Sequence, residues 1–115
     1  MFPVTVPSVE VSEVPARLPD GKVLLDVREP DEWAAGHAPG ALHIPMSELA
    51  GRLGELPADA DLYVVCRAGG RSARVVQYLN ANGWDATNVD GGMQVWAAQG
   101  RPLVAEVDGA EPEVI

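Results

Sequence analysis

The sequence predicts an α/β domain in which a parallel sheet carries helices on both faces. Two apolar runs, at residues 23–27 and 62–65, have the nearly continuous hydrophobicity of central strands that are buried on both sides. Segments with strand and helix patterns alternate along the chain, as they do where helices connect parallel strands. Its 115 residues suffice for one core and not for two, so we expect one domain over residues 1–115, with its core at about 9–103.

The segment before the first central strand has a weaker pattern. A short strand is expected at residues 9–11. Ser12 could then cap a brief helix that reaches residue 17, with Pro15 tolerated in its first turn. Residues 19–21, Pro-Asp-Gly, have the composition of a turn, and the first central strand should follow it.

A helix is expected over residues 29–35, directly after that strand. Pro30 suits the first helical position, and Asp31 and Glu32 place negative charge in the first turn, where the helix dipole favours it. Gly36 would end this helix.

A turn at residues 37–40 and a short strand at 41–44 come next. Ser47 can then cap a helix that Pro57 ends. Three leucines at helical spacing would form its buried face: Leu49, Leu53 and Leu56.

The best-defined helix covers residues 72–82, after the second central strand. Ser72 could cap its start, and Gly83 stands at its C-cap position. Its inward face is Val75, Val76 and Leu79. A last strand is expected at residues 86–89.

The chain then turns at residues 90–92 into a helix around residues 93–96, which Gly100 and Pro102 end. Residues 104–115 form an acidic tail with little pattern, and we expect this tail to be mobile.

Composition excludes several functional classes. The net charge of −9 argues against nucleic-acid and anionic-membrane partners, because both require basic surface. No apolar stretch approaches the roughly 18 residues of a membrane span, and residues 1–13 do not resemble a secretory signal. The single cysteine and two histidines make no metal cluster, so no metal or other cofactor is expected. One cysteine, with no internal disulfide possible, favours a reducing compartment, and we expect a cytoplasmic location.

Cys66, the only cysteine, ends the second central strand, where ligands bind in parallel sheets. A lone cysteine is usually a small buried hydrophobe. Here Gly69 and Gly70 allow successive main-chain N–H groups to point inward, and a helix begins close by. Such surroundings lower the pKa of a thiol and bind anions, so we interpret Cys66 as a nucleophile.

The segment 66–72, Cys-Arg-Ala-Gly-Gly-Arg-Ser, resembles the active-site loop of the rhodanese sulfurtransferases. The resemblance extends over residues 9–103. Residues 25–33 (LDVREPDEW), 36–45 (GHAPGALHIP) and 90–96 (DGGMQVW) are similar to three further motifs of that family, in the family's order. Ala38 and His43 depart from the commoner isoleucine and asparagine, but both lie outside the cysteine loop.

The resemblance implies a three-layer α/β/α domain with a central, mostly parallel sheet of five strands. It also implies a persulfide on Cys66, formed from a small anionic sulfur donor such as thiosulfate and passed to cyanide, a thiol or a partner protein. The negative sulfur would be held by the main-chain N–H groups of the loop, namely those of Arg67, Ala68, Gly69, Gly70, Arg71 and Ser72. Arg67 and Arg71 are the candidates for binding the donor's anionic end.

Three charged residues are expected to support the site. Asp26 and Arg28 fall at the end of the first central strand. A salt bridge from Arg28 to Glu32, or hydrogen bonds from Asp26 to neighbouring loops, would fix strand to helix. His37 could cap or bridge a loop, and Trp33 and Trp96 are interpreted as core residues.

Two other functions remain open from the sequence. A cysteine-dependent phosphatase of the related dual-specificity type has five residues between cysteine and arginine, whereas four separate Cys66 from Arg71, which favours sulfur over phosphate. A persulfide carrier or binding module that serves a protein partner is the second alternative.

Overall fold

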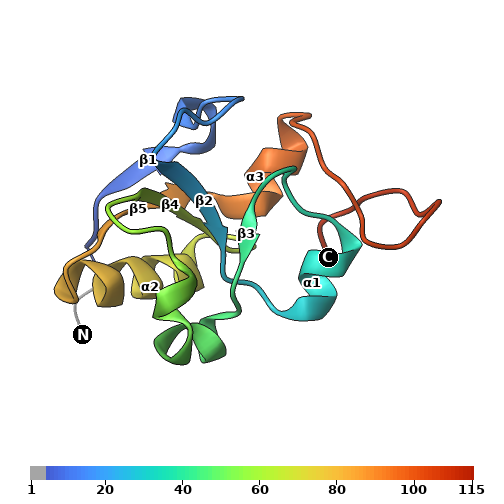
Figure 1. Cartoon of the computed structure of the whole chain (residues 1–115). Coiled ribbons are helices and arrows are strands. Elements are labelled where there is room, and N and C mark those ends of the chain that lie inside the picture. Colours follow the sequence, from blue (N-terminus) through green and yellow to red (C-terminus); the bar gives the residue numbers. More distant parts are fainter. Residues whose placement is uncertain (1–4) are drawn as a thin grey trace.

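A sheet of five strands forms the centre of the computed structural model, which describes residues 5–115 (Figure 1). The strands are β1 (Ser8–Glu10), β2 (Lys22–Asp26), β3 (Leu42–His43), β4 (Asp61–Val65) and β5 (Asp85–Asp90). They lie in the order β1-β5-β4-β2-β3, and each of the four pairings is parallel. This confirms the expected fold class. The expectations for residues 1–4, part of the single-domain and signal-peptide predictions, lie outside the described residues.

The two faces of the sheet have separate hydrophobic cores, because successive strand residues point to opposite sides. Leu25 and Val64 pack on the side of α2 (Gly70–Ala81). Leu24 and Val65 pack with Trp96 on the side of α3 (Gly92–Ala98). Figure 1 shows these two helices on opposite sides of the sheet.

Helix α1 (Pro30–Ala35) begins as predicted. Glu29 is its N-cap, and the main-chain N–H of Glu29 donates to the Glu32 carboxylate at 3.0 Å in a capping box. Pro30 occupies the first helical position, and the main-chain N–H of Gly36 makes the closing bond to the Glu32 carbonyl. Helix α1 therefore starts four residues after the end of β2 and lies near the carboxyl edge of the sheet.

Two of the expected helices are wrong in type and in cap. The helix predicted from Ser12 to residue 17 is a 3₁₀ turn, η1 (Val11–Glu13), with Glu10 as N-cap in a capping box with Glu13. It ends there because the N–H of Val14 bonds back to Val11 and Pro15 has no N–H to continue.

The helix predicted after Ser47 is two 3₁₀ turns, η2 (Met46–Gly51) and η3 (Leu53–Glu55), and Ser47 lies inside the first. Gly51 and Gly54 disfavour a continuous α-helix here. Leu49 and Leu56 are still buried, whereas Leu53 packs against the same core only partly buried.

Helix α2 also differs at its start. It begins at Gly70 after Gly69, whose positive φ of 112° favours glycine, so Ser72 is not its N-cap. Its end lies one residue earlier than predicted: the helix stops at Ala81 with Asn82 as C-cap. Gly83 follows with φ 88°, and the N–H of Trp84 bonds to the Leu79 carbonyl at 3.0 Å.

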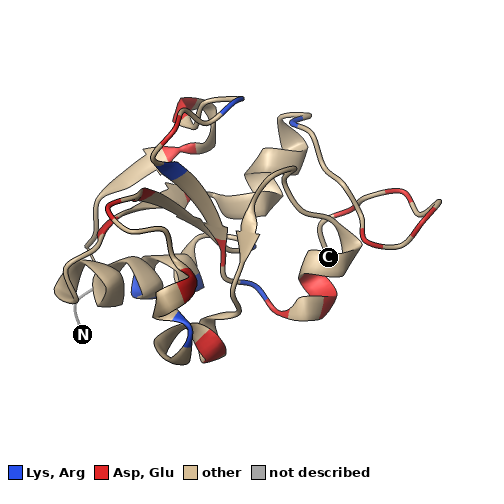
Figure 2. Ribbon diagram, in the orientation of Figure 1, with Lys and Arg blue, Asp and Glu red and all other residues tan. Residues whose placement is uncertain are grey.

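The acidic tail runs beside α1. The main-chain N–H groups of Glu106 and Glu113 donate to the carbonyls of Ala34 and Ala35 at 3.0 and 2.9 Å. Figure 2 shows acidic residues along this tail and in α1. The tail thus adds negative charge next to α1, and its mobility stays a prediction.

Over residues 5–115, no helix combines the length and the hydrophobicity that crossing a bilayer requires. The same residues contain no group of three or more histidine, cysteine or acidic side chains placed to hold a metal ion.

Candidate active site

Cys66 follows β4 directly, at the carboxyl edge of the sheet, and its side chain is 1% exposed. Hydrogen-bond donors of the loop reach its sulfur. The main-chain N–H of Gly69 lies 3.1 Å from Sγ, and the Ser72 hydroxyl lies 3.2 Å from it. The thiol is thus buried but not in apolar surroundings, which distinguishes it from an inert core cysteine.

The surroundings of Cys66 act on its pKa in both directions. Burial raises the pKa of the thiol, because a charged sulfur loses solvation. The Ser72 hydroxyl and the main-chain N–H groups of Ser72, Gly69 and Ala68 lower it, since they donate to the thiolate. The donors prevail, and the pKa of Cys66 lies below its ordinary value. The site therefore favours the nucleophilic form of the residue.

The first turn of α3 orients the cysteine loop. The N–H of Met93 donates to the Cys66 carbonyl at 2.8 Å, and the N–H of Gln94 donates to the Arg67 carbonyl at 2.9 Å. A trans peptide directs its C=O and N–H to opposite sides. Holding the Arg67 carbonyl toward α3 therefore turns the N–H of Ala68 the other way, toward the sulfur.

Gly92 makes this contact between helix and loop possible. Its φ is +58°, and a Cβ at this position would collide with the main-chain carbonyls of Cys66 and Arg67. Gly92, the first residue of α3, thus permits a close approach of two backbones, a role that the motif at residues 90–96 did not reveal by itself.

Asn88 is a site residue that the sequence reasoning missed. It lies in β5, is 3% exposed, and accepts a 2.5 Å hydrogen bond from the Ser72 hydroxyl. Its amide nitrogen donates to the Gly69 carbonyl at 3.3 Å and to Asp90 at 3.1 Å. Asparagine is unfavourable in strands, so its presence between Thr87 and Val89 was the available signal.

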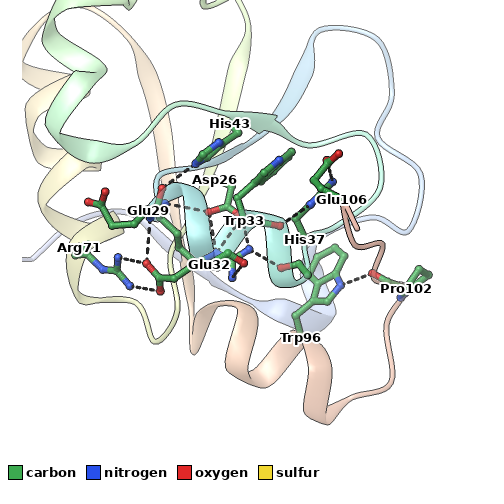
Figure 3. A network of polar contacts seen from close by, with 12 residues as sticks. Asp26, Glu29, Glu32, Trp33, His37, His43, Arg71, Trp96, Pro102 and Glu106 are labelled. Carbon is green, nitrogen blue, oxygen red and sulfur yellow. Dashed lines mark hydrogen bonds and ion pairs between the residues drawn. The ribbon is translucent and has the colours of Figure 1, made fainter. Parts of the chain in front are cut away.

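The two arginines predicted to bind the donor already have partners. The Arg71 guanidinium donates to both carboxylate oxygens of Glu32, at 2.7 and 2.9 Å (Figure 3). The hydrogen bond from Arg71 lowers the pKa of Glu32. Arg67 is exposed, and its Nε donates to the main-chain oxygen of Ile115 at 3.0 Å. Arg71 therefore stands at the rim of the loop with its charge paired, whereas Arg67 contacts the tail.

The remaining loop residues, Ala68 and Gly70, are exposed. Gly70 has open space beyond its Cα, so a side chain there would meet no neighbour. The loop is thus covered on the α3 side and open at these two positions.

Asp26 and Arg28 form a fully buried ion pair, with 2.7 Å between Nη2 and Oδ2. Arg28 also donates to the carbonyls of Gly36, at 2.8 Å, and Glu32, at 3.3 Å. The predicted Arg28–Glu32 salt bridge is wrong, because Asp26 takes the Arg28 guanidinium and Arg71 takes the Glu32 carboxylate. The supporting role is kept nonetheless, since Arg28 joins the end of β2 to the first turn and to the C-cap of α1.

Trp33 stacks between two histidines in the same network. Its ring centroid is 3.5 Å from that of His37 and 4.6 Å from that of His43, with interplanar angles of 5°. His37 bonds through Nδ1 to the Trp33 carbonyl at 2.9 Å and through Nε2 to Glu106 at 3.3 Å, which confirms the loop-bridging role expected of it. The two histidine rings thus bond to the backbone and to Glu106. Trp96, in contrast, is buried in the core and donates to the Pro102 carbonyl at 2.9 Å.

Comparison with known proteins identifies relatives of this fold and site. The sequence pattern of the Rhodanese family, described as a rhodanese-like domain, matches residues 10–99. A sulfurtransferase of Allochromatium vinosum is 37% identical over 103 residues, which are 87% of this chain and 96% of the relative. A putative sulfurtransferase of Bacillus subtilis is 39% identical over 79 residues, 69% of this chain and 77% of the relative. The crystal structure of a rhodanese-related protein from Thermoplasma volcanium superposes with a TM-score of 0.79 at 33% identity, covering 86% of this chain and 98% of that one.

Proposed function

This chain belongs to the rhodanese-like domain family, and we propose that it transfers sulfane sulfur from a donor such as thiosulfate to a thiophilic acceptor through a Cys66 persulfide. The acceptor would be cyanide, a thiol or a cysteine of a partner protein. Catalysis would be covalent and would need no cofactor.

The reaction proceeds in two displacements at sulfur. In the first, the Cys66 thiolate attacks the outer sulfur of thiosulfate, a sulfur–sulfur bond forms, and the donor's own sulfur–sulfur bond breaks. Sulfite leaves with that electron pair, and the negative charge passes from Sγ to the terminal sulfur of the persulfide. In the second, the acceptor attacks this terminal sulfur, and the Cys66 thiolate returns.

The observation that carries this proposal is that hydrogen-bond donors point at the Cys66 sulfur. The donors at Gly69 and Ser72 stabilise a negative sulfur at the bottom of the loop. They do so without a general base, which a thiolate nucleophile does not need.

The loop length supports sulfur over phosphate. Only four residues separate Cys66 from Arg71, one fewer than in the cysteine-dependent phosphatases that the loop also resembles. The smaller loop leaves less room for a tetrahedral phosphate.

Arg71 is proposed to bind the anionic end of the donor. An arginine has five N–H donors, and Glu32 takes two of those of Arg71. The remaining donors are available at the loop rim. Arg67 would join it where the tail releases its side chain.

Intact-protein mass spectrometry after mixing with thiosulfate tests the proposal. We expect a gain of one sulfur atom, which cyanide removes and which Cys66→Ala lacks. Absence of the adduct with thiosulfate and with other sulfane-sulfur donors would contradict it. Hydrolysis of an aryl phosphate that Cys66→Ser abolishes would favour the phosphatase instead, and an adduct that only a partner's thiol removes would favour the carrier role.

A further inference from the structure

The hydroxyl group of Ser72 has one proton and three acceptors within reach. Asn88 Oδ1 lies 2.5 Å from Oγ, while Cys66 Sγ and the Gly69 carbonyl each lie 3.2 Å from it. Ser72 is fully buried, and the short distance makes Asn88 the best-placed acceptor as long as the sulfur carries no charge. The sulfur and Asn88 therefore compete for one proton.

The orientation of the Asn88 side chain is determined by its other partners. Its amide nitrogen lies 3.1 Å from an Asp90 carboxylate oxygen and 3.3 Å from the Gly69 carbonyl oxygen. Exchanging the two ends of the amide would place its oxygen against both of these oxygens. The carbonyl end thus faces Ser72 and can only accept.

We propose that Asn88 is a positioning residue that shares the Ser72 hydroxyl proton with Cys66. The hydroxyl donates to the sulfur while Cys66 is a thiolate, and to Asn88 once Cys66 carries a second sulfur. The part concerning the loaded state rests on the function proposed above.

The charge movement of the reaction explains why the proton would change acceptor. Attack on the donor takes the negative charge from Sγ to the terminal sulfur, so Sγ becomes a neutral, weak acceptor. The hydroxyl then rotates to Asn88 Oδ1, and it rotates back when the thiolate returns. No proton leaves Ser72 in either step. Without Asn88 the hydroxyl would stabilise only the thiolate state and not the persulfide state. The attack of Cys66 on the donor would then be less favourable.

Each of the other charged groups around Cys66 has a hydrogen-bond partner, and Arg67, next in the chain, donates to the main-chain oxygen of Ile115. Arg71 on α2 is bound to Glu32 of α1, and Asp26 and Arg28 at the end of β2 are bound to each other. Asp90 at the end of β5 accepts from Asn88 itself. The ring nitrogens of His37 bond to Trp33 and Glu106, and His43 Nε2 bonds to Arg28, so neither histidine is bonded to Cys66. Exchanging Asn88 for a neutral residue leaves these charges in place.

The rate of Cys66 alkylation by iodoacetamide, followed against pH without any sulfur donor, tests the proposal. In Asn88→Ala the hydroxyl proton goes to the sulfur, so the alkylation midpoint should move to lower pH by roughly half a unit to one unit, the effect of one hydrogen bond. The rate constant above the midpoint should fall about two- to threefold, since a less basic thiolate is a weaker nucleophile. Asn88→Asp, which adds a negative charge and a stronger acceptor, should move the midpoint to higher pH.

Asn80→Ala is the matched control. Asn80 of α2 exchanges two hydrogen bonds with the main chain of Ala86 in β5, at 2.8 and 3.0 Å, and makes none with Ser72. It should leave the alkylation midpoint where it is. In Asn88→Asp the new negative charge raises the pKa of Cys66 even without Ser72, so the Ser72→Ala background is what separates proton sharing from other effects.

The decisive comparison uses protein that already carries Ser72→Ala. Adding Asn88→Ala to it should not move the alkylation midpoint, because the shared proton is gone. An unchanged midpoint in folded Asn88→Ala, or an equal shift in both backgrounds, would overturn the proposal. If Asn88→Ala does not fold, Asn88→Ser replaces it. The serine side chain is too short for its oxygen to reach Ser72, so the same shift of the alkylation midpoint is expected. Alkylation requires no sulfur donor, so this test and the mass measurement can fail independently.

Discussion

Arg71 and Glu32 form a bidentate ion pair across 39 positions of sequence, with contacts of 2.7 and 2.9 Å. Glu32 also accepts the N–H of Glu29 in the α1 capping box. One carboxylate therefore completes the start of α1 and neutralises the arginine at the rim of the cysteine loop. Under the proposed function, an anionic donor would compete with Glu32 for the Arg71 guanidinium.

Replacing Glu32 with glutamine should improve donor binding. The neutral side chain leaves the Arg71 charge unpaired, so the KM for thiosulfate should fall about two- to fivefold, the range of a partly exposed ion pair. The kcat should change little, because Cys66 and its donors are untouched. Arg71→Ala should raise the KM more than it lowers kcat. Glu48→Gln, which loosens an exposed pair with Arg52, is the control. A KM that neither change alters would remove Arg71 from the donor site.

The Arg71–Glu32 pair should also make the stability of the protein depend on pH in acid. The hydrogen bond from Arg71 holds the pKa of Glu32 below its ordinary value. A carboxyl group with a lowered folded pKa stabilises the protein above its unfolded pKa, roughly 4.3, and loses this contribution as the pH falls through the folded value. The difference in thermal stability between wild type and Glu32→Gln should be constant near neutral pH and shrink in acid. A difference that stays constant down to pH 3, roughly a unit below that pKa, would contradict this account.

Replacing the buried Arg28 should lower the free energy of unfolding much more than replacing an exposed arginine. Arg28→Leu leaves the Asp26 carboxylate buried without its counterion, which costs about 3–5 kcal/mol. Arg52→Leu removes only exposed pairs with Glu48 and Glu55, which solvent screens, and should destabilise the protein far less. Urea unfolding of both variants measures the difference. Equal losses would mean that the buried pair does not hold β2 to α1.

Gly92→Ala should disable the cysteine loop, because the new methyl group would meet the main-chain carbonyls of Cys66 and Arg67. Displacing the nucleophile by about 1 Å can cost on the order of 100-fold in rate. Gly100→Ala imposes a similar positive φ, 71°, in open space and controls for backbone strain. Persulfide formation should be lost in the first variant and kept in the second. Similar rates in both would show that the α3 contact does not position the loop.

Gly36→Ala should displace the tail from α1. A Cβ here would collide with the main chain of Glu113, although the extended backbone of Gly36 accepts any residue. Limited proteolysis within residues 104–115 should accelerate, while Gly51→Ala, which meets no atom within 4 Å, should behave as wild type. Equal cleavage rates would argue against packing of the tail on this helix.

Pattern reasoning was most successful where the signal is local. Strands 23–27 and 62–65 and the helix after Pro30 agree with β2, β4 and α1 to within one residue at each end. Serine caps were its main error: Ser12, Ser47 and Ser72 all lie inside helical turns instead of in front of them. Capping depends on the φ and ψ of the residue itself, and neighbouring residues (Glu10, Pro45 and Gly69) adopt the cap position in its place.

The sequence by itself determined the fold class, the position of Cys66 at a strand end and the loop of glycines that follows, because these depend on contiguous residues. Only the tertiary structure decided the partners: Asp26 for Arg28, Glu32 for Arg71, Asn88 for Ser72 and the start of α3 for the loop carbonyls. From the sequence alone, several acidic or amide side chains could be the hydrogen-bond partner of each of these groups. Burial selects among them, since a charge or hydroxyl removed from water must bond to whatever the packing of distant segments brings within about 3 Å.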